Sequence, residues 1–156
     1  MLLVRAAADL AVAARARDDA LAATAAMNEA GEHADAAGAE AARGRLDPGR
    51  WRWRPEFWML HVGPELARAA GRADSAGWAK IAKTAAAYSF PHGECYARWR
   101  QAEDLIAIGA PTEEIETVIA RGIDVGYANV PARSELEGLA ARLGMRIEPT
   151  RIAAVD

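Results

Sequence analysis

Residues 2–42 read LLVRAAADLAVAARARDDALAATAAMNEAGEHADAAGAEAA, and nineteen of these 41 residues are alanine. Alanine is the strongest helix former and is poorly represented in β-strands, so the stretch predicts helix. The pair Asp18-Asp19 interrupts it, because aspartate is favoured as the capping residue that begins a new helix. We therefore predict two helices, over residues 2–17 and 20–42, that approach each other closely around small side chains. The predicted buried stripe of the first helix consists of Leu3, Ala7, Leu10 and Ala14.

The rest of the chain repeats this alternation of helix and turn, and alanine makes up 40 of all 156 residues. Five further helices are expected to begin near Pro55, near Asp74 or Ser75, after a connection over residues 89–93, near Pro111 and near Pro131. The helix from Pro55 contains Gly63-Pro64, where it is either kinked or restarted. Seven helices with short links, and no alternating strand pattern, predict an all-α fold built as a stack of antiparallel helical hairpins.

The turns suggest a repeat. Gly71 and Gly109 stand 38 residues apart in equivalent turns between helices. Paired-helix repeats place a small residue there because the two helices come closest at the turn. We therefore predict degenerate tetratricopeptide-like hairpins, in one helical-repeat domain over residues 1–145 followed by a tail over 146–156.

Composition excludes several classes of protein. The formal net charge is −3, which argues against a general nucleic-acid binder. Cys95 is the single cysteine, so no internal disulfide framework is possible and a reducing compartment is favoured. No uncharged run reaches the length of a membrane span, and the N-terminal residues lack the unbroken apolar stretch of a secretory signal. We expect a cytoplasmic protein.

One stretch resembles a known family. Residues 91–105, PHGECYARWRQAEDL, are similar to the "PYP-x-AYARWRxAEAL" segment of the large ATP-binding LuxR-type transcriptional regulators, which are abundant in actinobacteria. Residues 130–140, VPARSELEGLA, resemble the closing "RPLRAEIEALA" helix of the same helical region. Residues 2–19 resemble an earlier helix, "LRAEADLAARARARRD".

The resemblance implies a function. In that family the region is a stack of tetratricopeptide-like helices between a nucleotide-binding module and a helix-turn-helix, and it receives effectors or partner proteins. This sequence has no G-x-x-x-x-G-K-[ST] phosphate-binding motif, and only thirteen residues follow Leu143. We therefore expect a regulatory module that binds a partner protein or a small effector, without ATP hydrolysis or DNA reading by the chain alone. Self-association into a homodimer is also expected, because short helical stacks expose their ends.

The candidate partner-binding residues are Trp51, Arg52, Trp53, Arg54, Arg98 and Trp99. The alternation of arginine and tryptophan over residues 50–54 could bind a protein partner, or bind phosphates while the rings stack on the bases of a nucleic acid. The competing interpretation is that the tryptophans pack on the helices while the arginine stems cover their rings.

An enzyme built on a helical bundle is the alternative function. Its site would assemble His61, Glu65, His92 and Cys95, which lie on different predicted helices or in loops. Neither histidine has a second cluster of ligands nearby in sequence, so we expect no metal, no cofactor and no catalytic residue. Cys95 lies on the apolar face of its helix, where cysteine usually acts as a small hydrophobe.

Overall fold

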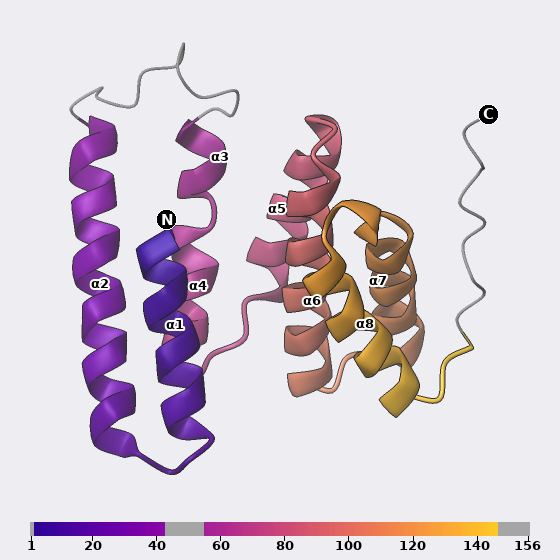
Figure 1. Ribbon diagram of the computed structural model, residues 1–156, viewed down its shortest axis with the longest axis horizontal. Coiled ribbons are helices and arrows are strands. Elements are labelled where there is room, and N and C mark those ends of the chain that lie inside the picture. The colour runs from indigo at the N-terminus through magenta and orange to yellow at the C-terminus, as the bar shows by residue number, and fades with distance from the viewer. Residues whose placement is uncertain (1, 43–54, 147–156) are drawn as a thin grey trace. The chain divides into compact units, whose positions relative to one another are not determined.

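The computed structural model describes residues 2–42 and 55–146, and these residues form helices joined by short turns, with no β-strand among them. The predicted all-α class is confirmed. The helices are α1 (Leu2–Arg15), α2 (Ala20–Ala42), α3 (Pro55–Met59), α4 (Val62–Ala69), α5 (Ser75–Ala87), α6 (Pro91–Ala107), α7 (Thr112–Asp124) and α8 (Val130–Arg142), with a 3₁₀ turn η1 (Gly126–Ala128) (Figure 1).

The helix predicted from Pro55 is two helices. It restarts after Leu60 and His61, so that Pro64 falls in the first turn of α4. The first N–H groups of a helix have no partner within it, so a proline there removes no helical hydrogen bond. The two alternatives left open at Gly63-Pro64 are thereby resolved in favour of a restart.

The chain forms two compact units, Met1–Ile81 and Ala82–Asp156, and the division falls within α5. In the first unit, α1 and α2 form an antiparallel hairpin against which α4 packs (Figure 1). Asp18 turns the chain with φ of 56°, and Asp19 caps α2, because its Oδ1 accepts a hydrogen bond of 2.9 Å from the N–H of Ala22. The predicted break at Asp18-Asp19 is confirmed.

Where α1, α2 and α4 meet, the core of the first unit is built from alanine. Elsewhere in this unit the larger side chains of Val4, Phe57, Trp78 and Ile81 are fully buried. The side chains in contact between α1, α2 and α4 are Ala7, Ala8, Ala11, Ala26, Ala30 and Ala69, with the partly buried Leu66 against them. The prediction for α1 was wrong at two positions. Leu3 and Leu10 are 61% and 58% exposed, whereas Ala7 and Ala14 are each only 2% exposed. Helices that meet through alanine come too close for leucine to fit between them, so the leucines turn outward.

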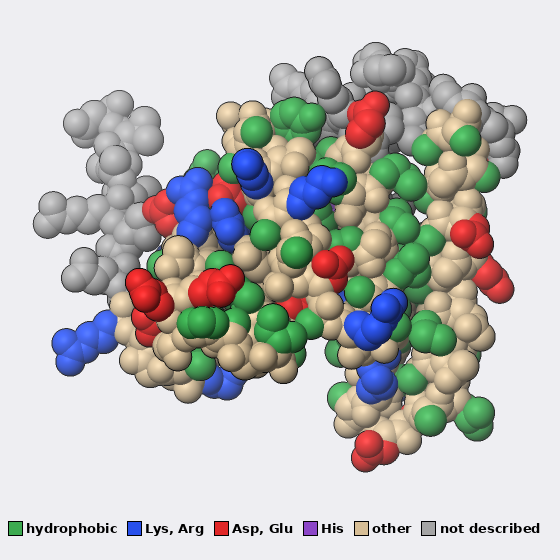
Figure 2. Space-filling view, turned by 180° about the vertical axis from the view of Figure 1, so that it is seen from behind, with side chains coloured by type: hydrophobic (Ala, Val, Ile, Leu, Met, Phe, Trp, Pro, Cys, Tyr) green, Lys and Arg blue, Asp and Glu red, His purple; other side chains and the backbone are tan. Residues whose placement is uncertain are grey.

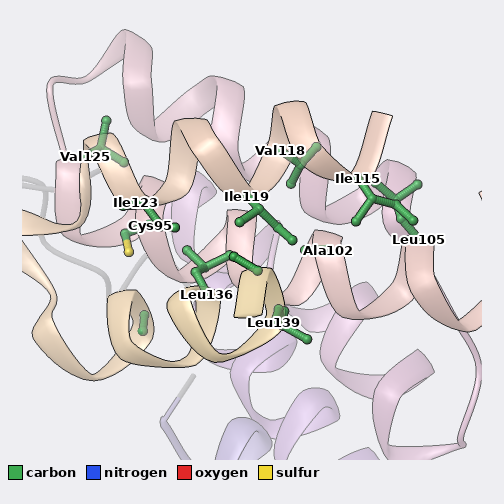
Figure 3. Close-up of a cluster of buried hydrophobic side chains, with 12 residues drawn as sticks. Cys95, Ala102, Leu105, Ile115, Val118, Ile119, Ile123, Val125, Leu136 and Leu139 are labelled. Carbon is green, nitrogen blue, oxygen red and sulfur yellow. The ribbon is translucent and has the colours of Figure 1, made fainter. Parts of the chain in front are cut away.

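The second unit has a core of large aliphatic side chains. Figure 3 shows side chains of α6, α7 and α8 pointing into one shared interior. Gly122 lets α7 approach α8, because a Cβ there would lie 2.5 Å from Cδ1 of Leu136. The buried cluster consists of Cys95, Ala102, Leu105, Ile115, Val118, Ile119, Ile123, Val125, Ala132, Leu136, Leu139 and Ala140.

Among the described residues, no helix is both long enough and apolar enough to cross a membrane.

Candidate functional site

The predicted partner-binding residues fall into two groups. Trp51, Arg52, Trp53 and Arg54 lie outside the residues that the structure describes. Arg98 and Trp99 lie on α6 in the second unit, and both are partly buried.

Arg98 and Trp99 are held by neighbours on their own helix. Arg98 donates from Nη1 to Oε1 of Gln101 at 3.1 Å, and its Nε lies 3.9 Å from a carboxylate oxygen of Glu94. Burial lowers the pKa of the Arg98 guanidinium. The guanidinium of Arg100 lies over the ring of Trp99, 3.7 Å from its centroid. That stack covers one face of the indole.

Glu94 joins α6 to α7. Its side chain is almost fully buried, and Arg121 of α7 donates to its two carboxylate oxygens at 2.9 and 3.4 Å. Arg121 also contacts Asp124 at 3.0 Å. A buried carboxylate needs such donors, because an unpaired buried charge is costly. Figure 2 shows acidic and basic side chains beside one another over this unit, rather than in separate fields.

His61 and Glu65 belong to the interior of the first unit. His61 is 5% exposed, its Nδ1 lies 3.2 Å from the carbonyl oxygen of Phe57, and its ring contacts aromatic rings of Phe57, Trp58 and Trp78. Burial lowers the pKa of the imidazole, so the neutral form is favoured.

Glu65 is fully buried and forms an ion pair with Arg68, whose Nη2 lies 2.7 Å from Oε2 of Glu65. The same guanidinium lies 2.8 Å from Oδ1 of Asp9 on α1. Glu65 therefore takes part in an ion-pair network that ties α4 to α1.

His92 and Cys95 contact one loop through separate atoms. His92 Nδ1 lies 3.1 Å from the carbonyl oxygen of Ala128, and Cys95 Sγ lies 4.0 Å from that of Asn129. Burial raises the pKa of the Cys95 thiol to about 11, so the thiolate that a nucleophile requires is scarce near neutral pH. Over residues 2–42 and 55–146, no three histidine, cysteine or acidic side chains gather into a metal-binding group.

The same loop presents apolar side chains to solvent. Tyr127 and Val130 are 67% and 70% exposed. Asn129 between them is buried and holds the loop: its Nδ2 donates to the carbonyl of His92 at 3.2 Å, and its Oδ1 accepts from the N–H of Ala132 at 3.3 Å. The second bond caps α8.

The ring of Phe90 lies 5.8 Å from that of His92, and His92 is the residue whose Nδ1 contacts the carbonyl oxygen of Ala128 in this loop. We name the surface formed by Phe90, His92, Tyr127 and Val130 the aromatic patch. Sequence reasoning missed it. The available signal was a tyrosine in the short link between Gly126 and Pro131, where no helical stripe calls for a buried ring.

An open hollow of about 350 Å³ lies at the start of α7, lined by Pro111, Glu113, Glu114, Thr117 and Val118. Glu113 and Glu114 stand in the first turn, where negative charge complements the helix dipole, so a structural role accounts for both.

Comparison with known proteins returned no match: no family model, no curated protein and no solved structure is similar to this chain.

Proposed function

We propose that this chain is a non-catalytic regulatory module of tetratricopeptide-like helical hairpins that binds a partner protein. The all-α fold supports the proposal, as does the similarity of residues 91–105 and 130–140 to the helical region of LuxR-type regulators. A small effector is the other ligand that this resemblance implies. We place the module in the cytoplasm and assign it no ATP hydrolysis and no direct DNA binding.

The aromatic patch is the single observation that carries the proposal. Tyrosine is enriched at the centres of protein interfaces, where a large rigid side chain becomes desolvated. Tyr127 and Val130 are both more than two-thirds exposed, on a loop that the two hydrogen bonds of Asn129 fix in place. A loop already held in one conformation loses little further entropy on binding.

The test is capture of partners from a host extract by the immobilised full chain. We expect the double variant Tyr127→Ser/Val130→Ser to capture at least tenfold less of the specific partner than the wild-type chain does. The matched control is Ile108→Ser, because Ile108 is 59% exposed but follows the opposite, C-terminal end of α6. It should retain the partner.

Capture of the same proteins by the wild type and the double variant would contradict the assignment of the patch. ATP cleavage by the purified chain, or tight salt-sensitive binding of duplex DNA, would contradict the assignment of function.

A further inference from the structure

Helix α1 presents its leucines to solvent and buries Val4 together with Ala7, Ala8, Ala11 and Ala14. Leu2, Leu3 and Leu10 are 81%, 61% and 58% exposed, whereas Ala8 and Ala11 are fully buried. Figure 1 shows α1 in front of α4 and beside α2, so these two helices leave one side of α1 uncovered.

The uncovered side has coiled-coil spacing. Leu3, Ala6, Leu10 and Ala13 follow one another at intervals of three, four and three residues, which places them along one stripe of the helix. Ala6 is exposed and Ala13 is partly exposed. We name these four residues the Leu/Ala stripe. It carries no charge, and large and small side chains alternate along it.

A stripe of this kind is complementary to itself when two helices run antiparallel. With residue 8 at the centre, Leu3 of one copy meets Ala13 of the second copy, and Leu10 meets Ala6. Every leucine then faces an alanine, which is the large-against-small pattern that lets side chains interdigitate. A two-fold axis applies the same contacts to both copies, as closed dimers require. A parallel pairing would set leucine against leucine and alanine against alanine.

The flank of the stripe carries both signs of charge. Asp9 lies next to Leu10 in sequence, and its carboxylate is 4.0 Å from Nε of Arg5 and 2.8 Å from Nη1 of Arg68. Antiparallel pairing brings Arg5 of one copy within a helical turn of Asp9 of the second copy. The same two-fold axis, near residue 8, also brings the Asp9 carboxylates of the two copies near each other, and each of them already has Arg5 and Arg68 of its own chain beside it.

We propose that two copies of this chain associate through the Leu/Ala stripe of α1, with the two α1 helices antiparallel about a two-fold axis. A single helix against a single helix makes a small interface, so the dimer is weak and reversible, with a dissociation constant of roughly 1–100 µM. This inference rests on α1 alone and is independent of the proposed function, which concerns the second unit.

Sedimentation velocity from about 1 µM to 1 mM tests the association directly. The wild-type chain should shift from monomer to dimer over this range. The double variant Leu3→Glu/Leu10→Glu should remain monomeric, because it places four carboxylates in the seam. Both leucines are more than half exposed, so the variant should keep the helical circular-dichroism signal of the wild type.

The matched control Leu21→Glu/Ala36→Glu adds the same charge at two exposed positions of α2, on the side opposite its buried alanines. It should dimerise as the wild type does. A wild-type chain that stays monomeric throughout overturns the proposal. So does a stripe variant that still dimerises, or a control that does not.

Cross-linking tests the orientation. Mixing Ala6→Cys and Leu10→Cys variants under mild oxidation should give mainly the mixed disulfide, since these positions face each other only in the antiparallel pair. Cys95 is buried with a raised pKa and should not react. Disulfides of each variant with itself would indicate a parallel pair, and no cross-link would indicate no pair. Either result overturns the proposal.

Discussion

The two units of the chain are held together by different chemistry. Between α1, α2 and α4 the contacts are methyl groups of alanine, whereas α6, α7 and α8 enclose isoleucine, leucine and valine. A buried alanine removes far less apolar surface from water than a buried leucine does. The first unit adds polar ties, since Arg15 donates to the carbonyls of Ala69 and Arg68 at 2.5 and 2.6 Å and Arg68 binds two carboxylates. The second unit has polar ties as well, since Arg121 binds the buried Glu94 and Asn129 caps α8, so the two units differ chiefly in the size of the side chains packed between their helices.

The largest effect should follow from breaking the ion-pair network of the first unit. Arg68→Met leaves the carboxylate of Glu65 buried without its guanidinium, which should lower the free energy of unfolding by about 3–5 kcal/mol. Urea titration followed by circular dichroism measures the loss, and hydrogen exchange should place it in α1 and α4. The double variant Glu65→Leu/Arg68→Met should recover much of the stability. An Arg68→Met variant as stable as the wild type would show that the buried Glu65 does not need the guanidinium of Arg68.

The second unit should respond most to truncation of an aliphatic side chain. Leu136 of α8 is fully buried and packs against α7. Leu136→Ala should therefore cost about 3 kcal/mol of unfolding free energy through lost burial and the cavity left behind. Leu143→Ala, at a position 38% exposed just after α8, is the control and should cost much less. Equal losses in urea titrations of the two variants would show that this core does not depend on aliphatic burial.

Adding a side-chain atom where α7 and α8 come close should lower the free energy of unfolding by less than the Leu136 truncation does. Gly122→Ala places a Cβ against Cδ1 of Leu136 and 3.0 Å from Cβ of Arg98, so the neighbours must shift, at about 1–3 kcal/mol. Gly138→Ala is the control, because its Cβ would contact only the flexible end of Arg142 at 3.5 Å. The midpoints of thermal unfolding compare the two, and a Gly122→Ala variant at least as stable as the control would mean that the helices lie farther apart.

The smallest effect concerns His61 and pH. Burial lowers the pKa of the folded imidazole below the unfolded value near 6.5, so the unfolded chain binds the proton more readily. Stability should therefore fall as the pH falls below about 6.5. His61→Gln, whose amide can still donate to the carbonyl of Phe57, should remove this dependence. A wild type and variant with parallel stability curves between pH 4.5 and 7 would exclude the imidazole as the cause.

Helix positions followed from sequence because their signals are local. Asp19 was predicted to cap α2, and Pro111 and Pro131 marked the starts of α7 and α8. The start of α6 was predicted wrongly, because α6 begins at Pro91, inside the predicted connection over residues 89–93. The orientation of α1 was predicted wrongly because hydrophobicity alone ranks leucine above alanine for burial. How close two helices approach depends on every residue in the contact, which no single stripe reveals.

The buried polar groups were harder to predict for a related reason. Glu94 owes its burial to Arg121, 27 residues away, and Glu65 depends on Arg68, which also reaches Asp9 on α1. The pairs Glu94–Arg121 and Asp9–Arg68 join different helices, so they emerge only once the helices are placed in space. The aromatic patch escaped prediction because exposure of Tyr127 is a property of the assembled loop.

The central claim is that α1 turns its alanines inward and its leucines outward, and cysteine accessibility tests it most directly. Single variants Leu3→Cys, Leu10→Cys, Ala7→Cys and Ala11→Cys would be labelled with a thiol reagent below 1 µM, where we expect monomers. Cys95 serves as the protected internal reference. We expect fast labelling at positions 3 and 10, and labelling at positions 7 and 11 only at the rate of unfolding. Slow labelling at positions 3 and 10 with fast labelling at 7 and 11 would contradict it.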